Sequence, residues 1–478
     1  MARYITTTLP YVNADPHIGF AHEIMQADVL ARTWRLNGEE VFFNTGSDEH
    51  GQKIFQAAEK AGQGVQEYAN RFAAQFEKLK GALAISNDAF IRTTDPKHIE
   101  AAQEMWRRCD AAGDIYKKSY TGMYCVGCEA FKTEKDIENG HCVLHPHLEL
   151  QEITEENYFF RFSKYQGALE AYLARKEVIV PEWRREEALN FVRGGLEDFS
   201  ISREAEKLSW GVPVPGDDSQ VMYVWFDALT SYISTLGWPS DADGLFKKFW
   251  EDGRTLQIGG KDQVRFQSLM WQAMLTSAGL KNTDQVFYQG FINSGGQKMS
   301  KSIGNVISPY ELVEKYGTEA TRYLLLRHVH PVEDTDVTWE RLDEWYTANL
   351  VNGLGNLVAR VMKLAETHLD GPVILSDDDT HVETSFLELI DSFQFQAAMD
   401  RIFEHITKGD EYMTEHEPYK KIKDPETETE ARAMLEKLVR HVAKIAAHLE
   451  SVMPETCEVI LAAVSRNTKP ENLFPRLT

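Results

Sequence analysis

The sequence predicts an α/β protein: a parallel-sheet domain interrupted by a cysteine-rich insertion and followed by an all-helical region. Strand and helix patterns alternate in the first hundred residues, which is typical of a parallel sheet with helical crossovers. Clustered Cys and His replace that alternation from about residue 114 to 209, and every periodic segment beyond about residue 345 has helical spacing. A length of 478 residues suits roughly three domains.

The first strand is expected at residues 4–8, which are short and β-branched. A turn at residues 13–16 leads into a helix at about 18–36, and a second strand at 41–44 runs on to Asp48. Strand, helix and strand in this order imply a parallel sheet that binds ligands at the carboxyl ends of its strands.

After the insertion, strand signals return at residues 222–226, 256–258 and 286–288, separated by helical segments such as 266–277. We therefore expect the sheet to be completed there. Apolar residues at helical spacing then mark the final region, at Leu350, Leu354, Leu357, Val358 and Val361 and again at Phe395, Met399, Ile402, Phe403 and Ile406.

Composition excludes several classes of protein. Hydrophobic residues make up 43% and charged residues 26%, which excludes disorder, and 74 acidic against 51 basic residues give a net charge of −23. That balance argues against binding polyanions through bulk charge. An odd five cysteines do not suggest a secreted disulfide framework, and we find neither a membrane-length apolar run nor a signal peptide. We expect a cytoplasmic protein without a membrane partner.

HIGF, residues 17–20, lies between the first strand and the first helix. A helix N-terminus presents unpaired N–H groups and a positive dipole end, so a phosphate can bind there. Gly19 lets a nucleotide approach the backbone, and His17 can donate to a phosphate oxygen. Alone, the motif is too short to be specific.

KMSKS, residues 298–302, lies in a predicted loop after two glycines. Two lysines and two hydroxyl groups in five residues suit a loop that closes over a triphosphate and stabilises charge on a departing pyrophosphate. The alternative is a solvated surface turn. The two motifs together make that alternative a poor explanation.

The insertion carries a metal-ligand spacing. Cys125 and Cys128 form CxxC, and after thirteen intervening residues Cys142 and His145 form CxxH. Two close pairs across a short loop suit tetrahedral Zn²⁺ in a closed, structural site. His141 and His147 compete for the fourth position, and buried unpaired cysteines are the alternative.

These motifs make the chain resemble a class I aminoacyl-tRNA synthetase. TLPYVNADPHIGF, GSDEHGQKI, SISREAE, YVWFDALTSYI, GKDQVRFQ and GNLVAR narrow the resemblance to the methionyl-tRNA synthetase family, over essentially the whole chain. It implies a Rossmann-like catalytic domain, a connective insertion with a zinc knuckle and a helical anticodon-binding domain. It further implies that methionine is activated by ATP and passed to the 3′ end of tRNA(Met), initiator and elongator, with Mg²⁺ accompanying ATP.

The resemblance assigns site residues. It implies catalytic roles for His17, Lys298 and Lys301. Nucleotide contacts would come from His17, Gly19, Phe20, Gly260, Asp262, Lys298, Met299, Ser300, Lys301 and Ser302. Leu9, Tyr11, Trp225, Ala228, Tyr232 and Phe266 would line a methionine pocket, since a thioether suits aromatic and small apolar walls. Asp48 would hold the substrate ammonium. Core packing, and an N-cap for Asp48, are the alternatives.

The helical region would read the anticodon. Asn356 and Arg360 lie four residues apart on one predicted helix face, and Tyr419 takes the place of a stacking Trp usual in the family. Residues 346–478 contain 14 basic and 23 acidic residues, so recognition would depend on a few placed contacts. A solvated helix face is the alternative.

Three residues depart from the family pattern. Phe20 replaces the second histidine that usually ends the first motif, and the nearest histidine, His22, lies two residues later. Gln267 stands where the family commonly has a histidine in the methionine pocket, and Phe199 stands where it often has a Trp. Phe20 motivates a rival hypothesis of a non-catalytic, synthetase-like binding protein. Synthetases for isoleucine, valine and leucine carry larger editing insertions than the roughly 95 residues here, and the aromatic pocket disfavours cysteine.

We expect five regions: halves of the catalytic domain at 1–113 and 210–293, the zinc-bearing insertion at 114–209, the KMSKS loop and stem-contact region at 294–345, and the anticodon-binding domain at 346–478. Because no oligonucleotide-binding barrel follows the last helix, we expect a monomer.

Overall fold

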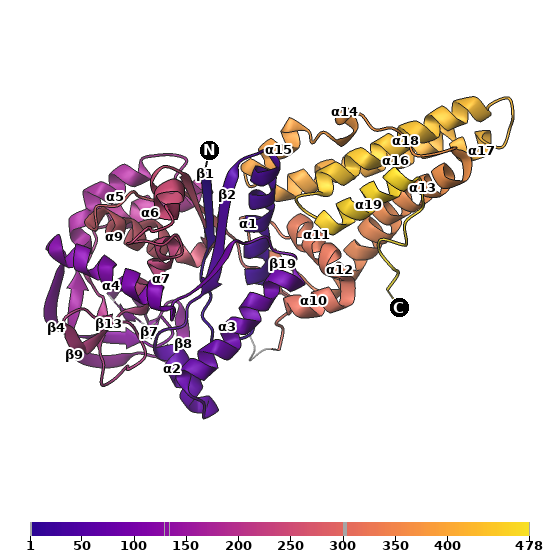
Figure 1. Ribbon diagram of the computed structural model, residues 1–478. Coiled ribbons are helices and arrows are strands. Elements are labelled where there is room, and N and C mark those ends of the chain that lie inside the picture. The colour runs from indigo at the N-terminus through magenta and orange to yellow at the C-terminus, as the bar shows by residue number, and fades with distance from the viewer. Residues whose placement is uncertain (1, 129, 133, 300–303, 478) are drawn as a thin grey trace. The chain divides into compact units, whose positions relative to one another are not determined.

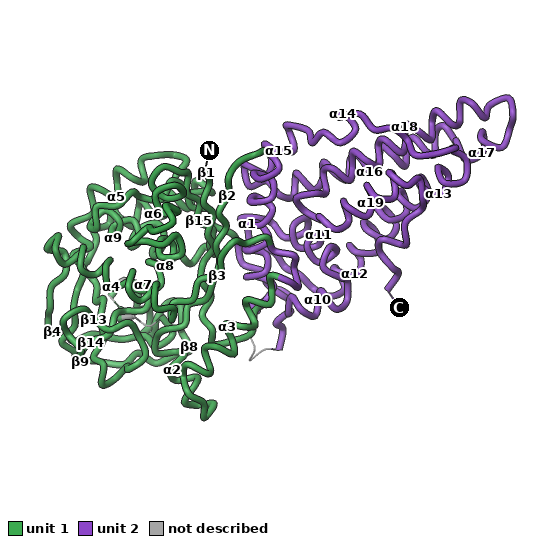
Figure 2. The backbone as a smooth tube through the Cα atoms, viewed as in Figure 1, with its two compact units in different colours: residues 1–16, 38–80, 86–289 green, residues 17–37, 81–85, 290–478 purple. Residues whose placement is uncertain are grey.

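The computed structural model describes residues 2–128, 130–132, 134–299 and 304–477 (Figure 1). The chain folds into two compact units, each assembled from separate segments (Figure 2). Unit 1 comprises residues 1–16, 38–80 and 86–289, and unit 2 comprises residues 17–37, 81–85 and 290–478. The expected division into five regions stays a prediction.

Unit 1 contains a six-stranded parallel sheet with β1 near its centre. Ile5 of β1 lies opposite Phe43 of β2 on one side and Leu256 of β15 on the other. The strand order is β10 (Ile179–Val180), β16 (Gln285–Gln289), β15 (Arg254–Gly260), β1 (Ala2–Thr7), β2 (Glu40–Ser47) and β3 (Ala89–Arg92). The predicted parallel sheet is confirmed, with strands at the positions expected near residues 4, 41, 256 and 286.

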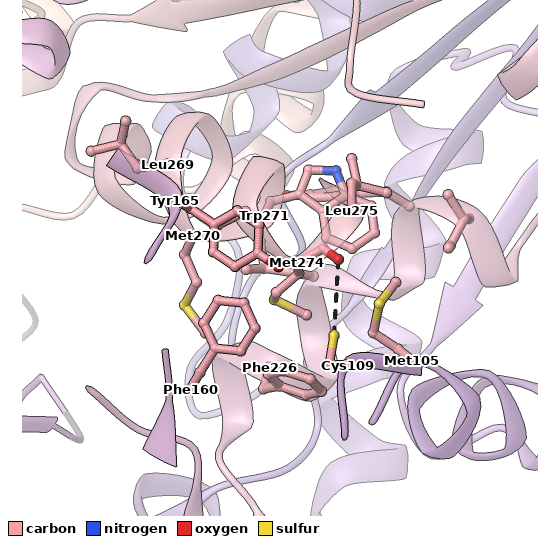
Figure 3. Packing of buried hydrophobic residues seen from close by; sticks show 14 of the residues in the cluster. Met105, Cys109, Phe160, Tyr165, Phe226, Leu269, Met270, Trp271, Met274 and Leu275 are labelled. Carbon is pink, nitrogen blue, oxygen red and sulfur yellow. Dashed lines mark hydrogen bonds between the residues drawn. The ribbon is translucent and has the colours of Figure 1, made fainter. Parts of the chain in front are cut away.

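Helices pack around this sheet, and the core of unit 1 is rich in buried aromatic side chains. Figure 3 shows Met105 and Cys109 facing Phe226, Met274 and Leu275 in a densely packed interior. Burial raises the pKa of Cys109 to about 12, so it stays a thiol. The helices of this part are α2 (Gln52–Ala61), α3 (Val65–Ala82), α4 (Pro96–Ala111), α5 (Gln166–Leu173), α6 (Glu182–Arg193), α7 (Val224–Leu229), α8 (Ser231–Ser234) and α9 (Trp271–Ser277), with π-helical stretches at Phe246–Glu251 and Phe266–Met270.

Antiparallel sheets build the cysteine-rich insertion and the segment up to Met222. The long pair β4 (Ile115–Cys125) and β9 (Gln151–Phe160) joins β5 (Ala130–Lys132) and β11 (Phe199–Ser200) in one sheet. A small sheet of β6 (Ile137–Glu138), β7 (His141–Cys142) and β8 (His145–Glu149) projects from it, and a third contains β12 (Ser202–Glu204), β14 (Asp217–Met222) and β13 (Pro213–Val214).

The prediction of a strand at residues 222–226 is wrong. β14 ends at Met222 in an antiparallel sheet, and helix α7 begins at Val224. The amide of Phe226 donates to the carbonyl of Tyr223 at 2.9 Å, and the Phe226 ring is fully buried with its edge toward Trp106. Tertiary packing therefore overrides the strand propensity of these β-branched and aromatic residues.

Unit 2 is mainly helical, as expected for the region after residue 345. Leu350, Leu354, Leu357, Val358 and Val361 are all fully buried, which confirms the helical periodicity. The helices are α1 (Ile18–Leu36), α10 (Pro309–Tyr316), α11 (Thr318–His328), α12 (Trp339–Trp345), a π-helical stretch Tyr346–Gly355, α13 (Asn356–His368), α14 (Asp377–Thr380), α15 (Thr384–Asp391), α16 (Phe395–His416), α17 (Pro418–Lys421), α18 (Glu428–Leu449) and α19 (Pro454–Arg466). Within the described ranges, every helix is too short or too polar to cross a bilayer.

A buried arginine connects the first helix of unit 2 to the turn before its last helix. The guanidinium of Arg322 lies 2.7 Å from Asp28 of α1, and neither side chain is exposed. Its remaining N–H groups donate to the carbonyls of Leu83, Ser451 and Val452. A buried charge is tolerated only when it is paired and hydrogen-bonded in this way.

Candidate active site and metal centre

The HIGF segment forms the N-terminus of α1. His17 is the N-cap, and its Nδ1 accepts a hydrogen bond from the amide of Gly19 at 3.0 Å. A side chain at Gly19 would place its Cβ 2.9 Å from the imidazole ring. Glycine is therefore needed for the ring to fold over the helix start.

This hydrogen bond determines the state of the imidazole. Because Nδ1 accepts, the neutral ring carries its proton on Nε2. Protein atoms around the ring, and then the charge of Lys298, lower the pKa of His17, although the residue retains exposed surface. His17 is therefore a neutral imidazole whose Nε2–H can donate to an anion.

The beginning of the KMSKS segment lies in the same unit. Lys298 ends the two-residue strand β18 (Gln297–Lys298), which pairs with β17 (Ile292–Ser294), and β17 also pairs with β19 (Thr335–Asp336). The Lys298 ammonium is 5.0 Å from the centre of the Phe291 ring. Met299 is half-buried, whereas Ser300, Lys301 and Ser302 lie outside the described residues.

A backbone contact ties the two segments together. The amide of Ile18, the first residue of α1, donates to the carbonyl of Ile307 at 3.2 Å. The start of α1 and the chain that follows KMSKS are thus neighbours, which their separation of almost 290 residues in sequence does not reveal.

Other predicted nucleotide contacts divide between the units. Phe20 is buried on α1 in unit 2. His22 is also buried, and its Nε2 lies 3.1 Å from the side-chain Nε2 of Gln26. Gly260 ends β15 in unit 1 at the carboxyl edge of the sheet, and Asp262 follows it on an exposed turn.

The residues predicted to bind the substrate methionine all belong to unit 1. Leu9 and Tyr11 follow β1, and Tyr11 forms an isolated parallel bridge with Asp48, which follows β2. The amide of Asp48 donates to the carbonyl of Pro10 at 2.9 Å. Neighbouring parallel strands thus bring a buried carboxylate beside an aromatic ring.

Aromatic rings gather above this carboxylate-bearing edge. Trp225 and Phe266 stack with centroids 3.9 Å apart and planes 12° apart, and Tyr11 meets Trp225 edge to face. All three are partly exposed and pack against the unit 1 core, while Ala228 and Tyr232 are buried. The arrangement provides the apolar, polarizable wall that a thioether prefers.

Gln267 has one satisfied and one unsatisfied polar atom. Its Nε2 donates to the hydroxyl of Tyr232 at 2.9 Å and to that of Thr8 at 3.2 Å, whereas its buried Oε1 has no hydrogen-bond partner. A side chain at Gly259 would collide with this amide. The Gln267 amide thus links Tyr232 and Thr8 through its Nε2.

Sequence reasoning missed a buried hydrogen-bonded chain close to Asp48. His50 Nδ1 and His98 Nε2 lie 2.7 Å from the two oxygens of Asp227, and His98 Nδ1 lies 2.9 Å from Ser234. Burial disfavours the Asp227 carboxylate, but the two imidazoles outweigh it and lower its pKa to about 2. His50 lies in GSDEHGQKI and Asp227 in YVWFDALTSYI, two motifs that carry the family resemblance, whereas none of those motifs contains His98.

The insertion brings four potential metal ligands together. Ligand atoms of Cys125, Cys128, Cys142 and His145 all lie within 4.8 Å of one another. The cysteines come from the end of β4, the following turn and β7. His145, rather than His141 or His147, belongs to this group in the part of the chain that the structure describes.

The group fits a tetrahedral metal. Cys128 Sγ is 3.6 Å from Cys142 Sγ and 3.2 Å from His145 Nδ1. Tetrahedral Zn–S bonds of about 2.3 Å place two sulfurs roughly 3.8 Å apart. Burial opposes a Cys142 thiolate, but backbone N–H groups of Leu144 and His145 aimed at its sulfur outweigh it and lower its pKa. Gly127 leaves space for the His145 ring.

The predicted anticodon residues belong to unit 2. Asn356 is exposed at the start of α13, and Arg360 lies one turn later, 3.3 Å from Asp410 of α16. Tyr419 is half-buried on α17, with its hydroxyl 3.3 Å from Glu417. Asn356 and Arg360 therefore share a helix face, and Tyr419 lies on a separate short helix.

Comparison with known proteins identifies the family. A family model described as "tRNA synthetases class I (M)" matches residues 3–152 and 134–362. Methionine–tRNA ligase of Thermotoga maritima is 39% identical over 98% of this chain and 76% of its own length, and that of Rhizobium meliloti is 40% identical over 97% and 91%. A solved structure, Mycobacterium tuberculosis methionyl-tRNA synthetase in complex with methionyl-adenylate, matches with a TM-score of 0.89 and 36% identity, covering 100% of this chain and 99% of that one. The chain therefore belongs to the methionine–tRNA ligases, a family of class I aminoacyl-tRNA synthetases.

Proposed function

We propose that the chain activates methionine with ATP to methionyl-adenylate, releasing pyrophosphate, and then passes the methionyl group to the 3′ end of tRNA(Met), releasing AMP. One observation carries the proposal: the start of α1, with HIGF, and the chain that follows KMSKS are neighbours in unit 2, where the Ile18 amide donates to the carbonyl of Ile307. Membership of the methionine–tRNA ligase family supports the choice of substrate.

In the first step the methionine carboxylate attacks the α-phosphorus of ATP. The bond from that phosphorus to the bridging oxygen breaks, and pyrophosphate leaves with the electron pair. No enzyme nucleophile is needed, so positioning and charge stabilisation supply the rate. We assign His17 Nε2–H to a phosphate oxygen, and Lys298 and Lys301 to the departing pyrophosphate. Mg²⁺ bound to ATP adds positive charge at the phosphates.

Further nucleotide contacts are proposed from Gly19, Phe20, Gly260, Asp262, Met299, Ser300 and Ser302. Gly19 supports this assignment because its missing side chain leaves space for the His17 ring over the helix start, where the ring can reach a phosphate. In the second step a hydroxyl of the terminal adenosine attacks the carbonyl carbon of the adenylate, and AMP leaves.

Methionine would be held at both of its ends. Asp48 binds the ammonium, and the aromatic wall receives the thioether together with Leu9, Ala228, Tyr232 and Gln267. The donors of the Gln267 amide are already bound to two hydroxyls, so its role is to order Tyr232 and Thr8 around the pocket.

We propose that Cys125, Cys128, Cys142 and His145 hold one structural Zn²⁺, which would fold the knuckle of β6 to β8. Four protein ligands leave no open coordination position for catalysis. The donor atoms and their spacing support this assignment.

Asn356, Arg360 and Tyr419 are proposed to read the tRNA(Met) anticodon by hydrogen bonding and stacking. Asp410 would hold the Arg360 fork in place until a base replaces it. A cytoplasmic, monomeric enzyme stays our prediction, and sedimentation of a species at twice 54.5 kDa would contradict the monomer.

ATP–pyrophosphate exchange without tRNA tests the proposal, run with each of the twenty amino acids. We expect exchange with methionine alone. Lys301→Ala should abolish exchange and spare tRNA binding, whereas Lys176→Ala, at an exposed lysine of unit 1, should change neither. No exchange with any amino acid, from a folded, zinc-containing sample, would favour the non-catalytic binding protein.

A further inference from the structure

Three metal-ligating side chains meet inside the helical bundle of unit 2, far from the cysteine group in sequence. Glu383 caps the start of α15, His405 lies on α16 and His448 on α18. One ligand atom of each lies within 4.8 Å of the others, and both histidines are buried. No role assigned above uses them.

The acceptor nitrogen of His448 belongs to the cluster. His448 Nδ1 donates to the carbonyl of Lys444 at 2.8 Å, so its Nε2 is the acceptor, and the amide of Glu383 donates to it at 3.2 Å. Such a hydrogen bond from the second ring nitrogen to a carbonyl is how metal-binding histidines are oriented. His448 thus has the tautomer that a metal ion requires, and an ion bound there replaces the Glu383 amide at the Nε2 lone pair.

His405 supplies a buried atom without a hydrogen bond. Its Nε2 has no hydrogen-bond partner, although it lies 3.4 Å from Glu383 Oε1. A buried polar atom left in this state costs stability unless a ligand satisfies it. The side chain is only 9% exposed, so bulk water cannot do so freely.

The spacing suits an ion between the two atoms. Metal bonds of about 2.0–2.1 Å to a histidine nitrogen and a carboxylate oxygen, at a tetrahedral angle, place those atoms roughly 3.3 Å apart. The observed 3.4 Å separation of His405 Nε2 and Glu383 Oε1 matches this edge. It is long for a charge-assisted hydrogen bond.

The surrounding charges set the expected affinity. Arg401 Nε and Lys444 Nζ lie 3.4 Å and 3.3 Å from the Glu383 carboxylate, both on side chains about one-third exposed. These long, flexible cations balance Glu383 in the metal-free protein and can swing into solvent.

We propose that Glu383, His405 and His448 form a second metal site, for a divalent transition ion of the zinc class. It would clip the start of α15 to α16 and α18 through one oxygen and two nitrogen ligands, leaving a fourth position for water. With no thiolate and two cations nearby, it should bind more weakly than the cysteine group. A mild chelator should therefore strip this site first.

Cobalt titration of the whole chain tests this proposal. The protein is dialysed against a mild chelator until only the knuckle metal remains, and Co²⁺ is then added. We expect one additional equivalent, with weak visible absorption and no new sulfur-to-cobalt charge-transfer band in the near ultraviolet. Zn²⁺ added in place of Co²⁺ should raise Tm.

Matched variants locate the added ion. His405→Ala should lose the additional equivalent, and Glu383→Gln should weaken it at least tenfold. His381→Ala, at an exposed histidine two residues before Glu383, should bind as the wild type does. Circular dichroism of each variant shows whether it is folded, and Glu383→Gln is nearly isosteric and should fold even if His405→Ala does not. A wild type that takes up no additional equivalent, or a folded Glu383→Gln variant that binds it as tightly as the wild type, overturns the site.

Discussion

Each unit holds a carboxylate between two buried histidines, but the two clusters are built differently. In unit 1, Asp227 is 1% exposed and lies 2.7 Å from both His50 and His98. In unit 2, Glu383 is 28% exposed, lies 3.4 Å from His405 and shares its charge with Arg401 and Lys444.

The difference separates a hydrogen-bond network whose named atoms are satisfied from one that leaves a buried nitrogen without a hydrogen bond. Both oxygens of Asp227 are engaged at short distance, and Ser234 engages the second nitrogen of His98. In unit 2 a histidine nitrogen has no hydrogen bond. The same residue types therefore indicate a positioning role in one unit and metal binding in the other.

The largest expected effect comes from removing the unit 1 carboxylate. Asp227→Ala leaves two buried imidazoles without their partner, so the free energy of unfolding should fall by roughly 3–5 kcal/mol. Urea unfolding measures this, with Asp218→Ala on the exposed part of β14 as the control. A loss below about 1 kcal/mol would mean that the network does not stabilise unit 1.

Lowering the pH should reduce the free energy of unfolding through the same Asp227 carboxylate. The pKa of Asp227 is lowered from 3.8 to about 2, so its ionised form stabilises the fold above about pH 4, and this is lost as the pH falls to 2. The loss is on the order of 2 kcal/mol. Stability measured from pH 5 to 2 should fall less steeply in Asp227→Asn than in the wild type. Parallel curves would rule out this carboxylate as the source.

A smaller effect is expected from one histidine of the network. His50→Gln leaves one Asp227 oxygen poorly satisfied, which costs roughly 1–3 kcal/mol. Because His50 stands two residues after Asp48, we also expect KM for methionine to rise more than kcat falls in the exchange reaction. An unchanged KM would show that His50 does not position Asp48.

The smallest effect should come from unit 2. In metal-free protein, Glu383→Gln removes long, partly exposed ion pairs, which are worth about 0–1 kcal/mol. Urea unfolding without added metal measures this. A loss as large as that of Asp227→Ala would make Glu383 a structural ion-pair partner and remove the contrast between the clusters.

How well a feature could be predicted depends on the sequence separation between the residues that form it. The group of Cys125, Cys128, Cys142 and His145 could be predicted because each of its two pairs is three residues apart. The predicted bounds of α1, 18–36, are confirmed. Asp227 is 177 residues from His50 and 129 from His98, so no spacing rule connects them. The prediction of a strand where α7 lies is wrong because the packing of Phe226 outweighs the local strand propensity.

The Arg322 contacts have a consequence for biosynthesis. Asp28 is synthesised 294 residues before its guanidinium partner Arg322, and more than 420 residues before Ser451 and Val452, whose carbonyls fix that partner. At roughly 5–20 residues per second, α1 waits on the order of tens of seconds for them. Arg32 of the same helix, 2.8 Å from Asp28, is made almost at once, whereas the buried pair with Arg322 has to wait. A nascent chain halted before residue 451 lacks two of the carbonyls that hold Arg322 in place.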